Sequence, residues 1–267
     1  MRRQASVLAG ICLTALTSFP ACAGAWTQSE NQGLVITTAA YYGAGDYFDN
    51  GGSRRSQPRY TKEELNPYVE YGLRDGLTLG GNFFIDRLDD TMHTRTGIGD
   101  SEIFLRRRLW QEGDYVLSVQ PLARLPALAS SQRQPALGSA TPDAAVSLLG
   151  GMQFTAFGQT HYAEMDAGYR FRFGPRADQV LLAATLGLRL DPRLTVMPQL
   201  FQTFRMGAGN GSFTESPRDD YTLTTAQLSA VYQLTDADAV QAGAFSHVAG
   251  KNTGAGGGVL LAYWRTF

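Results

Sequence analysis

The chain repeatedly alternates apolar and polar residues over segments of about ten to thirteen residues, a length that lets a tilted strand cross a bilayer. Successive side chains of a strand point to opposite faces. Within residues 161–173, one face carries Ala163, Met165, Ala167, Tyr169, Phe171 and Phe173, and the other carries Tyr162, Glu164, Asp166, Gly168, Arg170 and Arg172. The first face suits lipid and the second suits water. The periodicity alone fits either a membrane barrel or a soluble barrel whose apolar face points inward.

The connections between the segments favour the membrane barrel. We predict strands at residues 33–43, 59–73, 77–87, 98–110, 114–125, 143–155, 160–173, 178–190, 193–205, 220–234, 238–249 and 256–267. Long connections at 44–58, 88–97, 126–142 and 206–219 alternate with short ones at 74–76, 111–113, 191–192 and 235–237, and only 174–177 is short on the long side. Extracellular loops and periplasmic turns differ in this way. The sequence therefore predicts an all-β fold, a single closed antiparallel transmembrane β-barrel of about 12 strands, with ten or fourteen strands as alternatives.

Hydropathy excludes the other kind of membrane protein. Beyond the N-terminus, every run of about 18 residues contains charges or several polar groups, so no segment suits a membrane helix. A closed barrel is then the remaining spanning architecture, because lipid cannot satisfy the backbone groups of an open sheet edge. Aromatic residues gather near the strand ends, as an interfacial girdle requires, although strands of other β proteins also end this way.

The N-terminus has the pattern of a secretory signal. Arg2 and Arg3 precede an apolar run at residues 7–19, which Pro20 ends. Cleavage fits either Ala21-Cys22-Ala23 or Ala23-Gly24-Ala25, and we favour the second, which gives a signal peptide at 1–25 and a barrel at 26–267. Acylation of Cys22 in a lipoprotein is the alternative, which the preceding Phe19-Pro20-Ala21 fits poorly. Since Cys12 and Cys22 both lie in this signal, the mature chain has no thiol.

Several segments resemble a known family. They are Pro67-Tyr68-Val69-Glu70-Tyr71-Gly72-Leu73 with Leu77-Thr78-Leu79-Gly80, then Gly97-Ile98-Gly99-Asp100-Ser101-Glu102, and the glycine-rich stretch 249–256. Together they resemble the outer-membrane β-barrel family of transporters of the phenol (meta-pathway) degradation type. The resemblance is diffuse, spans most of the mature chain and rests on structural motifs. It implies a bacterial outer-membrane location and the uptake of small molecules, hydrophobic or aromatic ones among them, and it leaves the solute unspecified.

The C-terminal strand points to the partners of such a barrel. Residues 259–267 are apolar and aromatic and end at Phe267, which resembles the terminal signal of outer-membrane proteins. We therefore expect the outer-membrane assembly machinery, membrane lipid and lipopolysaccharide as partners. The 23 basic and 24 acidic residues nearly balance, and no basic patch suggests nucleic acid.

If the apolar faces point to lipid, charged side chains collect inside the barrel. The expected lumen or pore lining comprises Glu70, Asp86, Asp100, Glu102, Arg106, Arg108, Arg124, Glu164, Asp166, Arg170, Arg172, Arg189 and Arg205, with Lys62 and Glu64 beside them. Such an interior either fills the lumen as a structural network or lines a narrow polar pore. A barrel of about twelve strands lies between the filled eight-stranded and the open sixteen-stranded sizes, so both interpretations remain. The outward Arg107 is expected at the periplasmic rim.

The sequence shows no convincing arrangement of a nucleophile and a base. The mature chain has three histidines, His93, His161 and His247. His247 follows Ser246 in a predicted strand, and adjacent strand residues point to opposite faces, so this pair cannot act as base and nucleophile. We expect no catalytic residues, no cofactor and no metal site, and we keep a structural or ligand-binding barrel, and then a barrel lipid hydrolase, as the alternatives to a channel. The carboxylate pairs Asp89-Asp90 and Asp219-Asp220 are expected to be solvated loop charges.

Overall fold

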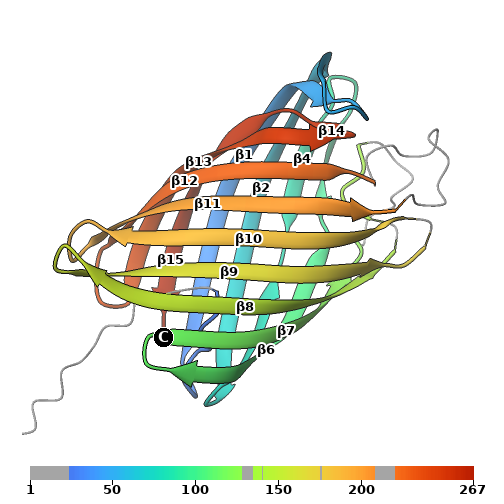
Figure 1. Cartoon of the computed structure of the whole chain (residues 1–267). Helices are drawn as coiled ribbons and strands as arrows, with labels where there is room; N and C mark the ends of the chain where they lie inside the picture. The colour runs from blue at the N-terminus through green and yellow to red at the C-terminus, as the bar shows by residue number, and fades with distance from the viewer. Residues whose placement is uncertain (1–23, 128–134, 140, 175, 208–219) are drawn as a thin grey trace, which may run out of the picture.

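A computed structural model describes residues 24–127, 135–139, 141–174, 176–207 and 220–267. The chain forms a closed antiparallel β-barrel (Figure 1). The signal peptide, its two cysteines and most of the long connection 206–219 lie outside the described residues, so the expectations about them stay predictions. No helix in the described part of the chain is long and apolar enough to cross a membrane.

Fifteen strand segments make up the barrel within the described residues. They are β1 (Gly33–Phe48), β2 (Arg54–Arg74), β3 (Leu77–Asn82), β4 (Ile85–Asp89), β5 (Thr94–Ile98), β6 (Ser101–Glu112), β7 (Tyr115–Leu125), β8 (Asp143–Ala156), β9 (Gln159–Arg172), β10 (Asp178–Arg189), β11 (Leu194–Met206), β12 (Thr222–Gln233), β13 (Asp238–Lys251), β14 (Thr253–Gly254) and β15 (Gly257–Thr266). Three pairs, β3 with β4, β5 with β6 and β14 with β15, are two parts of one strand separated by a short interruption. The segments therefore form twelve strands, which confirms the predicted fold class.

The first and last strands close the sheet. β1 pairs with β2 on one side and with β15 on the other, and all ladders are antiparallel. Gly33 N donates to the carbonyl of Phe267 at 2.8 Å, and Phe267 N donates to the carbonyl of Gly33 at 3.0 Å. Both described ends of the chain therefore lie at the end of the barrel that carries the short turns, which we call the turn end. The opposite end is called the loop end.

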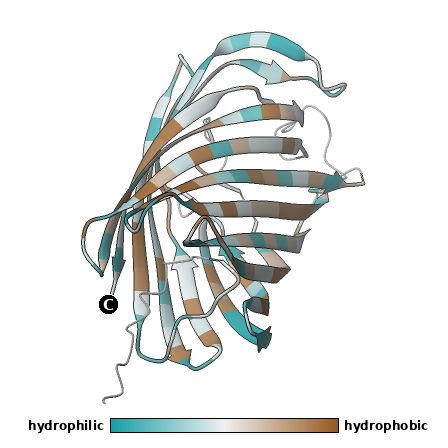
Figure 2. Cartoon of the chain, turned by 60° about the vertical axis from the view of Figure 1, so that its left-hand side comes forward, coloured by the Kyte–Doolittle hydropathy of each residue, from teal (hydrophilic) through white to brown (hydrophobic). Residues whose placement is uncertain are grey.

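Two connections that we predicted as long loops are partly strands. In residues 44–58, β1 continues to Phe48 and β2 begins at Arg54, and in residues 88–97, β4 ends at Asp89 and β5 begins at Thr94. Figure 2 shows the upper parts of these hairpins as largely hydrophilic. Ala44, Phe48 and Leu88 are buried on the inner faces of these hairpins, but the outer faces carry few apolar side chains, so the alternation that revealed the other strands is weak here.

The outer surface of the barrel is apolar along its strands. On β6, Ile103 and Leu105 are 49 % and 37 % exposed, whereas Phe104 and Arg106 between and after them are buried inside. On β9, Met165 is 71 % exposed, while Arg172 is buried. The arginine that interrupts the apolar face, Arg107, is exposed on β6 and pairs with Leu77, next to a short turn. The outward series is the one that the alternation predicted.

The inner surface is apolar as well near the turn end, which the alternation did not indicate. A buried cluster consists of Leu34, Ile36, Tyr162, Met197, Ala239, Ala262 and Trp264. Strands β1 and β15 therefore carry apolar side chains on both faces at this end. A barrel needs interior packing where nothing else fills the space, so apolar side chains line this end of the lumen beside the charged residues that the sequence analysis named.

Candidate functional site: the barrel lumen

The segment of residues 24–32 lies inside the barrel at the turn end and is called the N-terminal strap. Its backbone is held by polar groups of several strands. Ser118 Oγ on β7 donates to the carbonyl of Ala25 at 2.6 Å, and Arg106 Nη1 on β6 donates to the carbonyl of Trp26 at 3.0 Å. The strap thus crosses the lumen instead of running outside the wall.

The strap also donates hydrogen bonds to the wall. Ala25 N donates to Glu164 Oε1 at 3.1 Å, on β9. The backbone N of Gln28 donates to Thr78 Oγ1 at 2.8 Å, and its side-chain amide donates to Glu70 Oε2 at 2.6 Å. Because β8, β7 and β6 separate β9 from the neighbouring strands β3 and β2 in the sheet order, these bonds fix the strap at both sides of the lumen.

An ion pair stands at the centre of this arrangement. Arg106 Nη1 lies 2.7 Å from Glu70 Oε1, and their side chains are 3 % and 0 % exposed. The hydroxyl of Tyr68 donates to Glu70, and Arg106 Nε donates to Gln120 Oε1 at 2.9 Å. A buried charge pair is tolerated only when its remaining donors and acceptors are also used, and here they are.

The loop end of the lumen holds further ion pairs. Arg124 Nη2 is 2.5 Å from Glu102 Oε1, and Arg170 Nη2 is 4.0 Å from the same oxygen. Arg176 pairs with Asp143 at 2.5 Å. Arg172 Nη1 is 3.9 Å from Asp220 Oδ1. In a separate group, Lys62 Nζ lies 2.5 Å from Glu64 and 3.3 Å from Asp86.

Other residues of the expected lining lie apart from these pairs. Asp100 accepts hydrogen bonds from the amides of Ala127 and Ser139, so it anchors the connection after β7. Arg108 lies at the turn end, where it pairs with the exposed Asp75 at 2.7 Å. Arg205 is partly exposed on β11, and the buried Oδ1 of Asp166 has no hydrogen-bond partner among the residues that the structure describes. The expected residues therefore form several separate groups and not one continuous lining.

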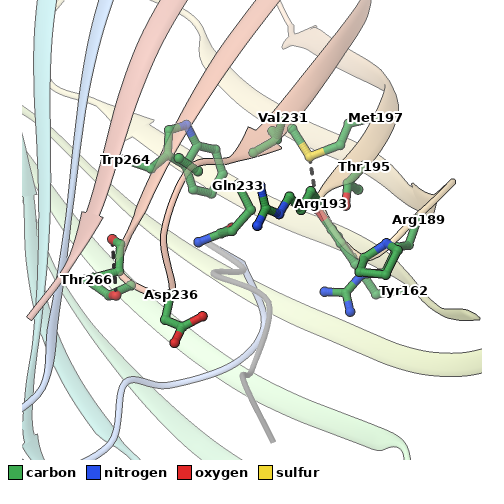
Figure 3. Close-up of a pocket in the computed structure, with 13 residues that line it drawn as sticks. Tyr162, Arg189, Arg193, Thr195, Met197, Val231, Gln233, Asp236, Trp264 and Thr266 are labelled. Carbon is green, nitrogen blue, oxygen red and sulfur yellow. Dashed lines mark hydrogen bonds between the residues drawn. The ribbon is translucent and has the colours of Figure 1, made fainter.

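The remaining member, Arg189, lines a small pocket at the turn end. Figure 3 shows Arg189, Arg193, Gln233 and Asp236 around this pocket, with Trp264 on one side and Tyr162 and Met197 on the other. The Tyr162 hydroxyl donates to Met197 Sδ at 3.0 Å. The cavity volume of about 70 Å³ holds a few water molecules and is too small for a drug-sized ligand.

Sequence reasoning missed the neutral partners of the charged groups. Tyr68, Thr78, Ser118, Gln120 and Gln179 all lie inside the barrel at inward positions. In each strand they occupy the same alternate positions as the inward charged residues. Including every inward position, and not only the charged ones, would have identified them. The role of the N-terminal strap had no such signal, because residues 24–32 show no periodicity.

His247 has a structural environment. Its Nδ1 lies 2.8 Å from the carbonyl oxygen of Gly254 and 3.3 Å from the hydroxyl of Tyr42. A nitrogen that donates to a backbone carbonyl is unavailable as a base. In the part of the chain that the structure describes, no group of three or more His, Cys, Asp or Glu residues is arranged to hold a metal ion.

The fold is shared with solved outer-membrane barrels. The structure of the COG4313 outer membrane channel from Pseudomonas putida F1 matches with a TM-score of 0.70 and 17 % sequence identity over 93 % of this chain and 99 % of that one. The NanC porin matches with a TM-score of 0.59 and 6 % sequence identity over 86 % of this chain and 98 % of that one. The KdgM porin matches with a TM-score of 0.52 and 8 % sequence identity over 86 % of this chain and 99 % of that one. No protein-family model and no curated protein sequence matches the chain. At these identities the likeness establishes the fold.

Proposed function

We propose that this protein is a bacterial outer-membrane channel that lets small molecules cross. The observation that carries the proposal is the contrast between the two faces of one closed wall: apolar side chains outside and ion pairs inside, as on Glu102, Arg124 and Arg170. Lipid would meet the apolar face, and a water-filled lumen would solvate the ionic one. The solved barrels that share the fold are called channels and porins, which agrees with this proposal.

The lumen has hydrogen-bonding capacity that the protein itself does not use. Arg170 Nε and Gln179 Nε2 are buried and have no hydrogen-bond partner among the described residues. Both lie on adjacent strands, with Arg170 Nη1 3.4 Å from Gln179 Oε1. Unused donors of this kind suit a passing polar solute or water. The resemblance to transporters of phenol degradation adds a proposed preference for small, apolar or aromatic solutes that carry a polar group.

The strap determines how wide such a channel is. Because residues 24–32 cross the lumen at the turn end, solute would pass beside the strap or only after it moves. The competing proposal is a structural or ligand-binding barrel without transport, and a permanently bound strap would favour it. We propose that the protein is not an enzyme, since His247 Nδ1 is occupied by a carbonyl.

Flux measurements on the purified protein in liposomes separate these proposals. We expect swelling with small sugars or amino acids, and discrete conductance steps in planar bilayers, with empty and heat-denatured preparations as controls. A variant lacking residues 24–31 provides the matched comparison. If neither the intact protein nor this variant passes any solute or ion, the channel proposal is wrong and the structural barrel is favoured.

A further inference from the structure

Gly24 and Ala25 lie in a complementary site on the inner wall of the barrel. Ala25 is 1 % exposed, and it packs against Val116 and Leu149, which are 3 % and 4 % exposed. Its carbonyl accepts from Ser118 Oγ at 2.6 Å, and its amide donates to Glu164 Oε1 at 3.1 Å. Every polar and apolar group of Ala25 therefore has a partner in the wall, as expected for a residue of the mature protein and not of a removed signal.

Gly24 lies against the same carboxylate. A Cβ atom on Gly24 would be 1.9 Å from Glu164 Oε1, so only glycine fits here without moving that side chain. The backbone nitrogen of Gly24 is bonded to the same Cα and is therefore within a few ångströms of the carboxylate. A positive charge on this nitrogen would be placed beside Glu164.

Glu164 has no cationic side chain within 4.0 Å among the described residues, and Arg106, which already pairs with Glu70, attracts it only from farther away. Glu164 accepts a hydrogen bond from the neutral amide of Ala25, whereas other lumen acids such as Glu70 and Glu102 have an arginine within 2.7 Å. Asp166, two residues along the same inner face of β9, has a buried oxygen without a hydrogen-bond partner in the described part of the chain. A partly buried carboxylate without a directly bonded counter-charge is unfavourable, so a cation beside Glu164 would stabilise this end of the lumen.

We propose that the signal is cleaved between Ala23 and Gly24, and that the new α-ammonium group of Gly24 is the missing partner of Glu164. Hydrolysis of that peptide bond consumes one water, leaves a carboxylate on Ala23 and releases an amine on Gly24, which takes up a proton at neutral pH. The small residues Ala21 and Ala23 satisfy the cleavage pattern. The mature protein then begins two residues earlier than the Trp26 start that the sequence alone favours.

Cleavage after Ala25 fits the structure less well. It would remove the residue that fills the space between Val116 and Leu149, and it would leave Ser118 Oγ and Glu164 Oε1 without their partners. Cleavage after Ala23 keeps all of these contacts and adds an ion pair. Export therefore both processes the chain and completes the anchor of the strap.

The cleavage site is tested on protein exported from the full-length gene and purified from outer membranes of a Gram-negative host. Intact mass and N-terminal peptide sequencing are expected to give Gly24 as the first residue. A start at Trp26, an acylated Cys22 or an uncleaved chain would overturn the proposal. Solute flux plays no part in this outcome, so it does not depend on the channel proposal.

The ammonium pair is tested by amine labelling. Lys62 and Lys251 are the only lysines, so the N-terminal amine is easily followed by peptide mass spectrometry. In the native protein we expect labelling of Gly24 several-fold slower than in urea. Glu164→Gln should raise the native rate several-fold, and the control Glu102→Gln, whose partner is Arg124, should leave it unchanged. No protection in the folded wild type, or equal rates in both variants, would contradict the pair, and the urea comparison stands even if Glu164→Gln does not fold.

Discussion

Glu70 on β2 and Arg106 on β6 form a buried ion pair of 2.7 Å that also binds the N-terminal strap. Glu70 accepts from the side chain of Gln28, and Arg106 donates to the carbonyl of Trp26. The two residues thus connect the barrel wall to the segment that crosses its lumen. Stability and permeability are therefore expected to depend on the same pair.

Removal of one partner should strongly destabilise the barrel. In Arg106→Ala, Glu70 is left as an uncompensated buried charge, which costs about 3–5 kcal/mol. The free energy of unfolding in urea, followed by the gel mobility of folded and unfolded forms, measures the loss. Arg107→Ala is the matched control, because Arg107 is exposed on the outer face of the same strand. Equal effects of the two substitutions would contradict the role of the pair.

Loss of the strap should widen the channel. Deletion of residues 24–31 removes the hydrogen bonds to Ser118, Glu164 and Thr78, so we expect a larger single-channel conductance than in the intact protein. Trp26→Ala should increase it less, since it removes the packing of the indole against Tyr162 and the neighbouring apolar side chains but keeps the hydrogen bonds of the strap backbone. Planar-bilayer recording tests both, and unchanged conductance in the deletion variant would show that the strap does not obstruct the pore.

The charge of the loop end should set ion preference. Glu102→Gln removes the carboxylate between Arg124 and Arg170, so the lumen becomes more positive there. We expect the reversal potential in a salt gradient to shift toward anion selectivity, most clearly at low ionic strength, where screening is weak. Glu63→Gln is the control, because Glu63 is 57 % exposed and pairs with Arg87 away from the lumen. A shift of equal size in both variants would assign the effect to net charge alone.

The sequence predicted the wall better than the contents of the barrel. Period-two alternation located the strands and the outward side chains, because one face of most strands is apolar over much of its length. The extra length of β1 and β2 escaped prediction, since polar and charged residues such as Arg55 and Arg59 replace the apolar series there, although Phe48 is buried. Leu34 and Trp264 also lie inside the barrel, where only knowledge of the empty interior space shows that apolar packing is needed.

The contacts inside the lumen were also only partly predictable from the sequence. Charged residues such as Arg106 and Glu164 were expected inside, and the structure places both there, but the sequence did not indicate which charges pair. Pairing across the lumen depends on the stagger of distant strands. The strap adds contacts that join residues 25 and 164, and no local pattern carries information about a contact of that sequence separation.

The orientation of the two faces is tested most directly by spin labels at adjacent positions of β9. Residues 26–267 contain no cysteine, so Met165→Cys and Asp166→Cys can each carry a single label in the bilayer-reconstituted protein. The label at 165 should collide more often with oxygen, which dissolves in lipid, and the label at 166 more often with a water-soluble nickel complex. If the label at 165 is instead shielded from lipid, or the label at 166 meets oxygen more often than nickel, the apolar face does not contact acyl chains and the channel account fails.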